Sequence, residues 1–173
     1  GAHNMKRETM RPLIYFILTV LVGTGVHFLY DWSPNVLFAM LSPVRESVWE
    51  HGKLIFWPML AALLVYTRKD KEQRGGWYFG VLVAQGLLLL SGCVYHIRME
   101  QMSLPVDIAA FVVILGLGFL TALWVPVPPR WKSPLLFGVG VFAILIVVFS
   151  FWQPDGLLFA DLELADALSV LPC

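Results

Sequence analysis

The sequence has few charged residues and almost no cysteine. Only 14% of its 173 residues are charged, whereas about 25% are charged in a typical soluble domain. Lysine and arginine together number 12, as do aspartate and glutamate, so no basic surplus is present and we expect no nucleic-acid partner. Cys93 and Cys173 fit no CxxC or zinc-ligand spacing, and the sequence leaves open whether they form a disulfide.

Apolar residues are abundant instead. They make up 58% of the chain, and the mean hydropathy is +0.75. A single domain of roughly 170 residues cannot bury such an excess in its core, because a large share of its surface stays exposed. Lipid is therefore the expected solvent for most of the chain, and the composition predicts an all-α integral membrane protein.

The apolar segments predict five transmembrane helices, since a bilayer core of about 30 Å requires about 20 residues of helix. The expected spans are residues 12–30, 44–66, 77–96, 105–125 and 134–152, within one domain covering residues 5–153. Between the first two spans, Val36–Leu41 is short and suits a re-entrant or interfacial segment. Ser42 and Pro43 have the form of an N-cap and first residue for the second span.

Both termini of the chain lie outside the predicted spans. Residues 1–4 precede Met5, and we expect them to be a remnant of cloning, so His3 is left out of the site. Residues 154–173 form an acidic, amphipathic tail, which we expect to pack over the outer helix ends as a lid.

The distribution of basic residues predicts the orientation in a plasma membrane. Basic side chains are concentrated in cytoplasmic loops of multi-pass proteins. The N-terminal side of the predicted spans carries nine of them: Lys6, Arg7, Arg11, Arg68, Lys69, Lys71, Arg74, Arg130 and Lys132. The opposite side carries three: Arg45, Lys53 and Arg98. The N-terminus is thus predicted to be cytoplasmic and the C-terminus to be outside.

Ionisable residues gather at the outer ends of these spans. His27, His51 and His96 each end or begin a different span, and several carboxylates lie at the same depth. If the first helix continues, His27 and Asp31 stack at spacing i, i+4; likewise, the second helix would place Glu46, Glu50 and Lys53 on one face. Separate charges near hydrocarbon are costly. We therefore predict one pocket formed by His27, Glu46, Glu50 and His51, with His96 and Asp107 at its rim.

Two chemistries suit such a pocket. A divalent metal, Zn or Mn, would take nitrogen and oxygen ligands from His27, Asp31, Glu50, His51 and His96. Acid–base catalysis would use Glu46, Glu50, His51 and His27. Trp49, Lys53, Tyr95 and Asp107 are the candidates for contacts with a substrate at the rim. The alternative is structural, with intrahelical pairs of Lys53 and an Asp107 that stabilises a helix N-terminus.

The run from His27 to Ser33 (HFLYDWS), followed by that from Ser42 to Lys53 (SPVRESVWEHGK), resembles a family of small bacterial membrane proteins known only as a domain of unknown function. The resemblance implies a multi-span protein of the bacterial plasma membrane and no particular activity. It also implies that five residues belong to the signature of the family: Glu46, Trp49, Glu50, His51 and Lys53.

Three functions remain open from the sequence. One is a membrane-embedded hydrolase or group-transfer enzyme that acts on a lipid or lipid-linked substrate at the outer leaflet. The second is a small transporter or ion-binding protein that uses the same residues as a coupling site. The third is a non-catalytic membrane subunit or sensor whose polar cluster is purely structural. Membrane lipids are the only partners that the sequence indicates.

Overall fold

The computed structural model describes residues 2–99 and 102–162, and this part of the chain is helical, without strands. It contains five helices that are long and apolar enough to cross a membrane, which confirms the number expected from the sequence. The long helices are α1 (Ala2–His27), α4 (Val48–Tyr66), α5 (Arg74–Gly92), α6 (Leu104–Trp124) and α7 (Pro129–Phe151). The short ones are α2 (Leu29–Trp32), α3 (Val36–Leu41), η1 (Lys71–Gln73), the π-helix η2 (Cys93–Arg98), which continues α5, and η3 (Leu157–Phe159).

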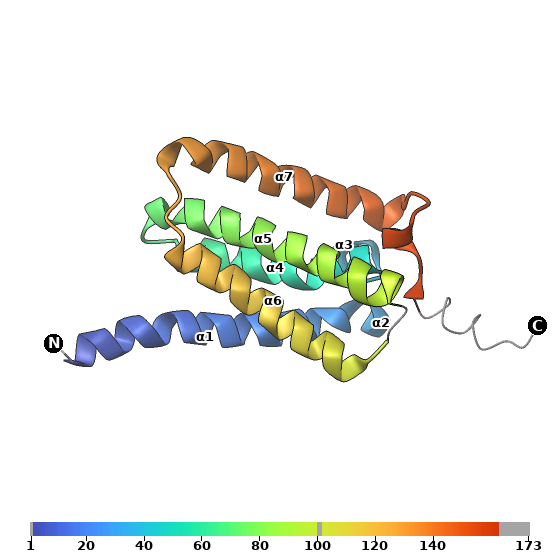
Figure 1. Ribbon diagram of the computed structural model, residues 1–173, viewed down its shortest axis with the longest axis horizontal. Coiled ribbons are helices and arrows are strands. Elements are labelled where there is room, and N and C mark those ends of the chain that lie inside the picture. Colours follow the sequence, from blue (N-terminus) through green and yellow to red (C-terminus); the bar gives the residue numbers. More distant parts are fainter. Residues whose placement is uncertain (1, 100–101, 163–173) are drawn as a thin grey trace, which may run out of the picture.

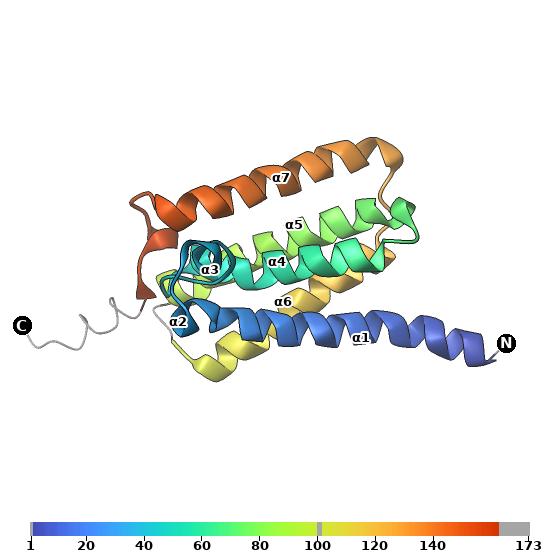
Figure 2. The same cartoon turned by 180° about the vertical axis from the view of Figure 1, so that it is seen from behind.

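The long helices form one bundle, in which each runs antiparallel to the long helix before it in the sequence (Figure 1). α4 and α5 lie in the middle, with α1 and α6 on one side and α7 on the other, and the view from behind shows the same order (Figure 2). α1 and α7 finish, and α4 and α6 begin, at the same end of the bundle, which we call the distal end (near His27, Val48, Leu104 and Phe151). The N-terminus lies at the opposite end.

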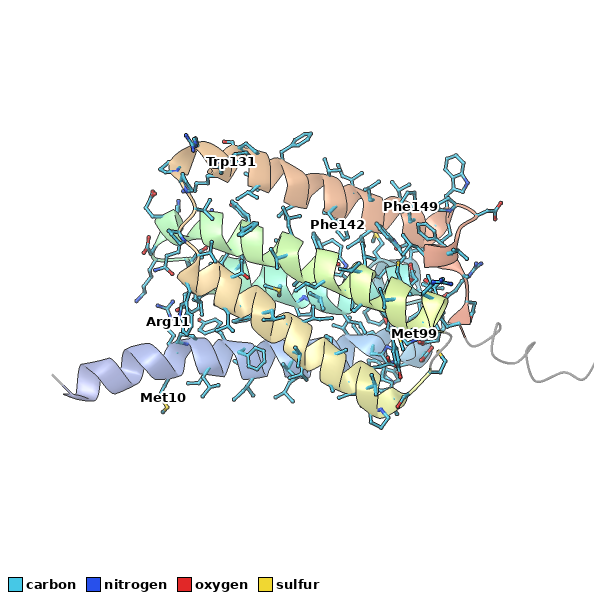
Figure 3. The ribbon with its side chains drawn as sticks, in the orientation of Figure 1. Met10, Arg11, Met99, Trp131, Phe142 and Phe149 are labelled. Atoms are coloured by element: carbon cyan, nitrogen blue, oxygen red, sulfur yellow. The ribbon has the colours of Figure 1, made fainter. Side chains whose placement is uncertain are left out.

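The core is built around α4. Ile55, Phe56 and Met59 of this helix are fully buried, because α4 packs against both α1 and α5. α1 and α7 are different, since only 11% of the residues in the apolar stretch of each helix are buried and each exposes a row of large apolar side chains. Met10 and Arg11 illustrate this on α1: Met10 points away from the bundle, whereas Arg11 points toward it (Figure 3).

Glycine allows α5 and α6 to pack closely. A side chain at Gly80 would collide with the backbone oxygen of Gly118, and one at Gly76 would collide with that of Ala122. Small residues at such positions are typical of helices that associate in a membrane.

Several helix boundaries differ from those predicted, and the span expected at residues 77–96 is α5 followed by η2. α1 covers Ala2–His27 instead of residues 12–30. Phe28 separates it from α2, so the predicted span ends three residues early. α4 begins at Val48 instead of residue 44, and its N-cap is Ser47, whose Oγ accepts from the amide of Glu50 at 3.3 Å. α7 begins at Pro129 instead of Pro134. Either proline can occupy the first turn of a helix, and here the earlier one does so.

The segment predicted to be re-entrant or interfacial forms the short helix α3, with the bounds expected from the sequence. Asn35 caps its start by accepting from the amide of Phe38 at 3.0 Å. Two of its last carbonyls are satisfied by side chains of α4: Lys53 donates to Ala39 at 2.8 Å, and Trp57 donates to Met40 at 2.9 Å. α4 thus fixes the end of α3 and the start of the connection that follows it. Residues 163–173, with Cys173 and most of the predicted tail, lie outside the described residues.

Candidate functional site

Three of the predicted residues come together at the distal end. His27 is the last residue of α1, His51 lies in the first turn of α4, and Glu46 lies on the connection between α3 and α4. The Nε2 atom of His51 is 3.1 Å from one carboxylate oxygen of Glu46, and that of His27 is 4.0 Å from the other. The two imidazole rings stack with their centroids 5.8 Å apart. One donor atom from each residue lies within 4.8 Å of the others, as a shared metal ion would require.

Local hydrogen bonds bring these residues to one place. The hydroxyl of Ser42 donates to the carbonyl of His27 at 3.2 Å and accepts from the amide of Tyr30 at 3.3 Å. The start of the connection is therefore tied to the end of α1. Because Ser42 is engaged in this way, it does not cap α4, and Ser47 takes that role five residues later. The resulting non-helical stretch carries Glu46 across to His27.

The hydrogen bonds of His51 determine its protonation. Its Nδ1 atom lies 2.8 Å from the carbonyl oxygen of Ser47. A carbonyl only accepts, so Nδ1 carries a proton. The Nε2 atom then has only a lone pair in the neutral ring, yet it faces a carboxylate oxygen of Glu46. Two lone pairs repel each other at that distance, and a cation between them, either a proton or a metal ion, removes the repulsion.

Glu46 is the negative partner in this group. The hydrogen bond from His51 is the main cause that holds the pKa of the Glu46 carboxyl below its ordinary value. Partial burial acts in the opposite direction, while positive charge on His51 and on His27 acts in the same direction as the hydrogen bond. Glu46 is therefore ionised at neutral pH. The Nδ1 atom of His27 is buried and has no hydrogen-bond partner among the described residues.

Glu50 and Lys53 form a separate, buried ion pair. Their side chains are not exposed, and the Nζ and Oε2 atoms are 2.6 Å apart. Glu50 Oε2 also accepts from the amide of Val44 at 2.8 Å, and Lys53 also donates to the carbonyls of Ala39 and Ser42 at 2.8 and 3.2 Å. The pair thus fastens the connection between α3 and α4. This agrees with the structural alternative for Glu50 and Lys53.

The prediction that Glu46 shares a helix face with Glu50 and Lys53 is wrong, because α4 begins at Val48 and Glu46 precedes it. The stacking of Asp31 on His27 is also absent, since Phe28 separates α1 from α2, and Asp31 lies exposed on α2. Trp49 is buried among Phe142, Phe149 and Phe159 and belongs to the core instead of a substrate-facing rim.

His96 and Asp107 form a second pair beside this group. The Nε2 atom of His96, on η2, is 3.1 Å from a carboxylate oxygen of Asp107, in the first turn of α6. The ring of Tyr95 contacts that of His96 edge-on, with centroids 5.0 Å apart. The charge of Asp107 also interacts with that of His51. The pair therefore lies near the three-residue group without belonging to it.

Two features of the site escaped the sequence reasoning. One is the role of the Ser47 carbonyl in orienting His51; the spacing Ser47-x-x-Glu50 is that of a capping box and could have located the start of α4. The other is a hydrogen bond at 2.8 Å from the amide of Leu162 to the carbonyl of Glu46, which no local pattern indicates.

Comparison with known protein families finds a family whose model matches most of the chain. The model of the family of unknown function DUF6512 matches residues 4–164. The chain belongs to this family. The match includes all residues of the site and confirms the resemblance to a family of unknown function. No curated protein and no solved structure matches the chain. Roles for the members of the site therefore rest on their geometry.

Proposed function

We propose that the chain is a multi-pass protein of the plasma membrane, with a cytoplasmic N-terminus and the distal end at the outer leaflet. Five helices of sufficient length and hydropathy support this. The outward apolar faces of α1 and α7 support it as well, because lipid would cover them. Nine of the twelve basic residues of the sequence lie at the end of the bundle opposite to the site, which is the pattern of a cytoplasmic side.

Within that setting, we infer that His27, Glu46 and His51 bind a divalent cation, Zn²⁺ or Mn²⁺, and that the protein is a metal-dependent hydrolase or group-transfer enzyme. The observation that carries this is the His51 ring, which donates through Nδ1 to Ser47 and turns Nε2 toward the Glu46 carboxylate. Backbone-oriented imidazoles of this kind are typical metal ligands.

The donor set also suits hydrolysis. Two histidines and one glutamate are the protein ligands in one class of hydrolytic zinc sites, which keep a further position for water. Bonds of about 2.1 Å in a tetrahedral site separate ligand atoms by about 3.4 Å. One donor atom from each of the three residues lies within 4.8 Å of the other two, so a cation would have to draw these atoms closer together to reach this spacing. A bound cation would lower the pKa of a water molecule, and the His96–Asp107 pair is the nearby group that could take up its proton.

The position of the site at the ends of the helices, beside apolar outer faces, supports a substrate that is itself partly apolar. The three residues are partly exposed and lie where helices end, beside the outward apolar faces. A site at this depth is accessible to the headgroup of a lipid while the acyl chains stay in the bilayer. We therefore propose a lipid or lipid-linked substrate in the outer leaflet.

Metal binding is the direct test. Protein purified in detergent without chelator is analysed for bound metals, then stripped and titrated with Zn²⁺ and with Mn²⁺ by calorimetry. About one equivalent is expected for the wild type, and Glu46→Gln and His51→Ala should each weaken binding at least tenfold. Asp31→Asn is the matched control, because Asp31 is exposed on α2, and it should bind as the wild type does. Absence of binding, or equal affinity in Glu46→Gln, would contradict the proposal and favour a structural ion-pair network.

A further inference from the structure

The segment that follows α7 crosses the distal end and reaches the connection that carries Glu46 (Figure 1). We call residues 153–162 the strap. Gln153 accepts from the guanidinium of Arg45 at 3.3 Å, and at the other end of the strap the amide of Leu162 donates to the carbonyl of Glu46 at 2.8 Å. The strap thus contacts two consecutive residues of the connection, one of which is a member of the candidate metal site.

An aromatic cluster anchors the strap to the bundle. Phe159 of the strap packs against Trp49 and Phe149, with ring centroids 5.4 and 5.2 Å apart. Phe149 and Phe142 lie on the inner side of α7 (Figure 3), and both contact Trp49 at 5.3 Å. Because Trp49 lies two residues before His51 on α4, these contacts fix the strap relative to the helix that supplies His51.

Glu46 depends on such support more than its two partners do. His27 and His51 are held by α1 and α4, whereas Glu46 lies on the non-helical connection. The connection is held before Glu46 by the bond from the Val44 amide to Glu50, and it enters α4 after Ser47. At Glu46 itself, the main-chain carbonyl is held by Leu162.

We propose that the strap positions Glu46 for cation binding and that the amide of Leu162 is the positioning group. This rests on the proposed metal site and adds a dependence that the three ligands alone do not have. When the strap is docked, the Glu46 backbone is fixed and its carboxylate faces both imidazoles. When the strap is released, the carboxylate loses that constraint, so the affinity for the cation falls although every ligand is still present.

Two substitutions at one residue separate the amide from the side chain. Leu162→Pro removes the N–H donor, whereas Leu162→Ala shortens the side chain and keeps the donor. In a calorimetric titration with Zn²⁺, Leu162→Pro should bind about five- to tenfold more weakly than Leu162→Ala, the range expected for one hydrogen bond. Thermal unfolding of both variants shows whether they remain folded. Equal zinc affinity in the two folded variants would overturn the proposal.

A second measurement does not depend on metal. Diethylpyrocarbonate acylates neutral imidazole, and mass spectrometry gives the rate at His51. If the strap holds Glu46 against His51, metal-free Leu162→Pro should react faster than metal-free Leu162→Ala, because the Glu46 carboxylate, 3.1 Å from the Nε2 atom of His51, no longer covers that atom. A wild type that binds no zinc, with this difference in rate preserved, would refute the metal site and leave the positioning role standing. Equal rates in the two variants would refute the positioning role.

Discussion

Replacing Lys53 by methionine should destabilise the protein severely, although Lys53 is no ligand of the candidate site. The methionine fills a similar volume without the ammonium group. It leaves the Glu50 carboxylate buried and without its 2.6 Å partner, and the carbonyls of Ala39 and Ser42 lose their donor. Removing one member of a buried ion pair costs about 3–5 kcal/mol, so we expect the free energy of unfolding to fall by at least about 3 kcal/mol.

A double-mutant cycle tests the origin of this loss. Glu50→Gln removes the buried charge, while its remaining oxygen still accepts from the amide of Val44. The double variant, Lys53→Met with Glu50→Gln, therefore leaves no unpaired charge and should be more stable than the sum of the single effects by about 1–3 kcal/mol.

The assay is denaturant-induced unfolding in detergent micelles, followed by tryptophan fluorescence. Lys132→Met is the matched control, because Lys132 meets the exposed Glu72 at 3.9 Å, and pairs of this kind contribute little to stability. A Lys53→Met variant as stable as Lys132→Met would refute the reasoning, since it would mean that the pair is not buried or that water reaches it.

Two further predictions concern acid and orientation. The pKa of Glu46 is lowered in the folded protein from its ordinary value of 4.5. The ionised carboxylate therefore stabilises the fold at pH values above 4.5, and this stabilisation is lost as the pH falls through the pKa of the folded state. Glu46→Gln should thus flatten the acid side of a plot of Tm against pH, and an unchanged slope would exclude this carboxyl as the cause. For orientation, with Cys93 and Cys173 replaced by serine, Lys71→Cys should be protected from a membrane-impermeant maleimide in intact cells and Asp155→Cys should be labelled. The reverse pattern would invert the topology.

The sequence determined the architecture to a large extent, because hydropathy and turn residues act locally. Five apolar segments gave the five long helices. The short run Val36–Leu41, bounded by Asn35 and Ser42, gave α3 with its bounds correct. Membership of a family of unknown function was likewise expected from the sequence and is confirmed by the family match. Placing the three histidines at one end of the bundle required only the lengths of the helices.

Tertiary structure decided which of the clustered residues meet. Glu46 and Glu50 are equally suited to a metal by residue type, yet only Glu46 joins the histidines. The reason is that Lys53 and the Val44 amide hold Glu50 in the core, while Ser42 leads the connection toward His27. The strap contact of Leu162 joins residues 116 positions apart, from 46 to 162. Such contacts depend on the packing of whole helices, so no periodicity or spacing in the sequence contains them.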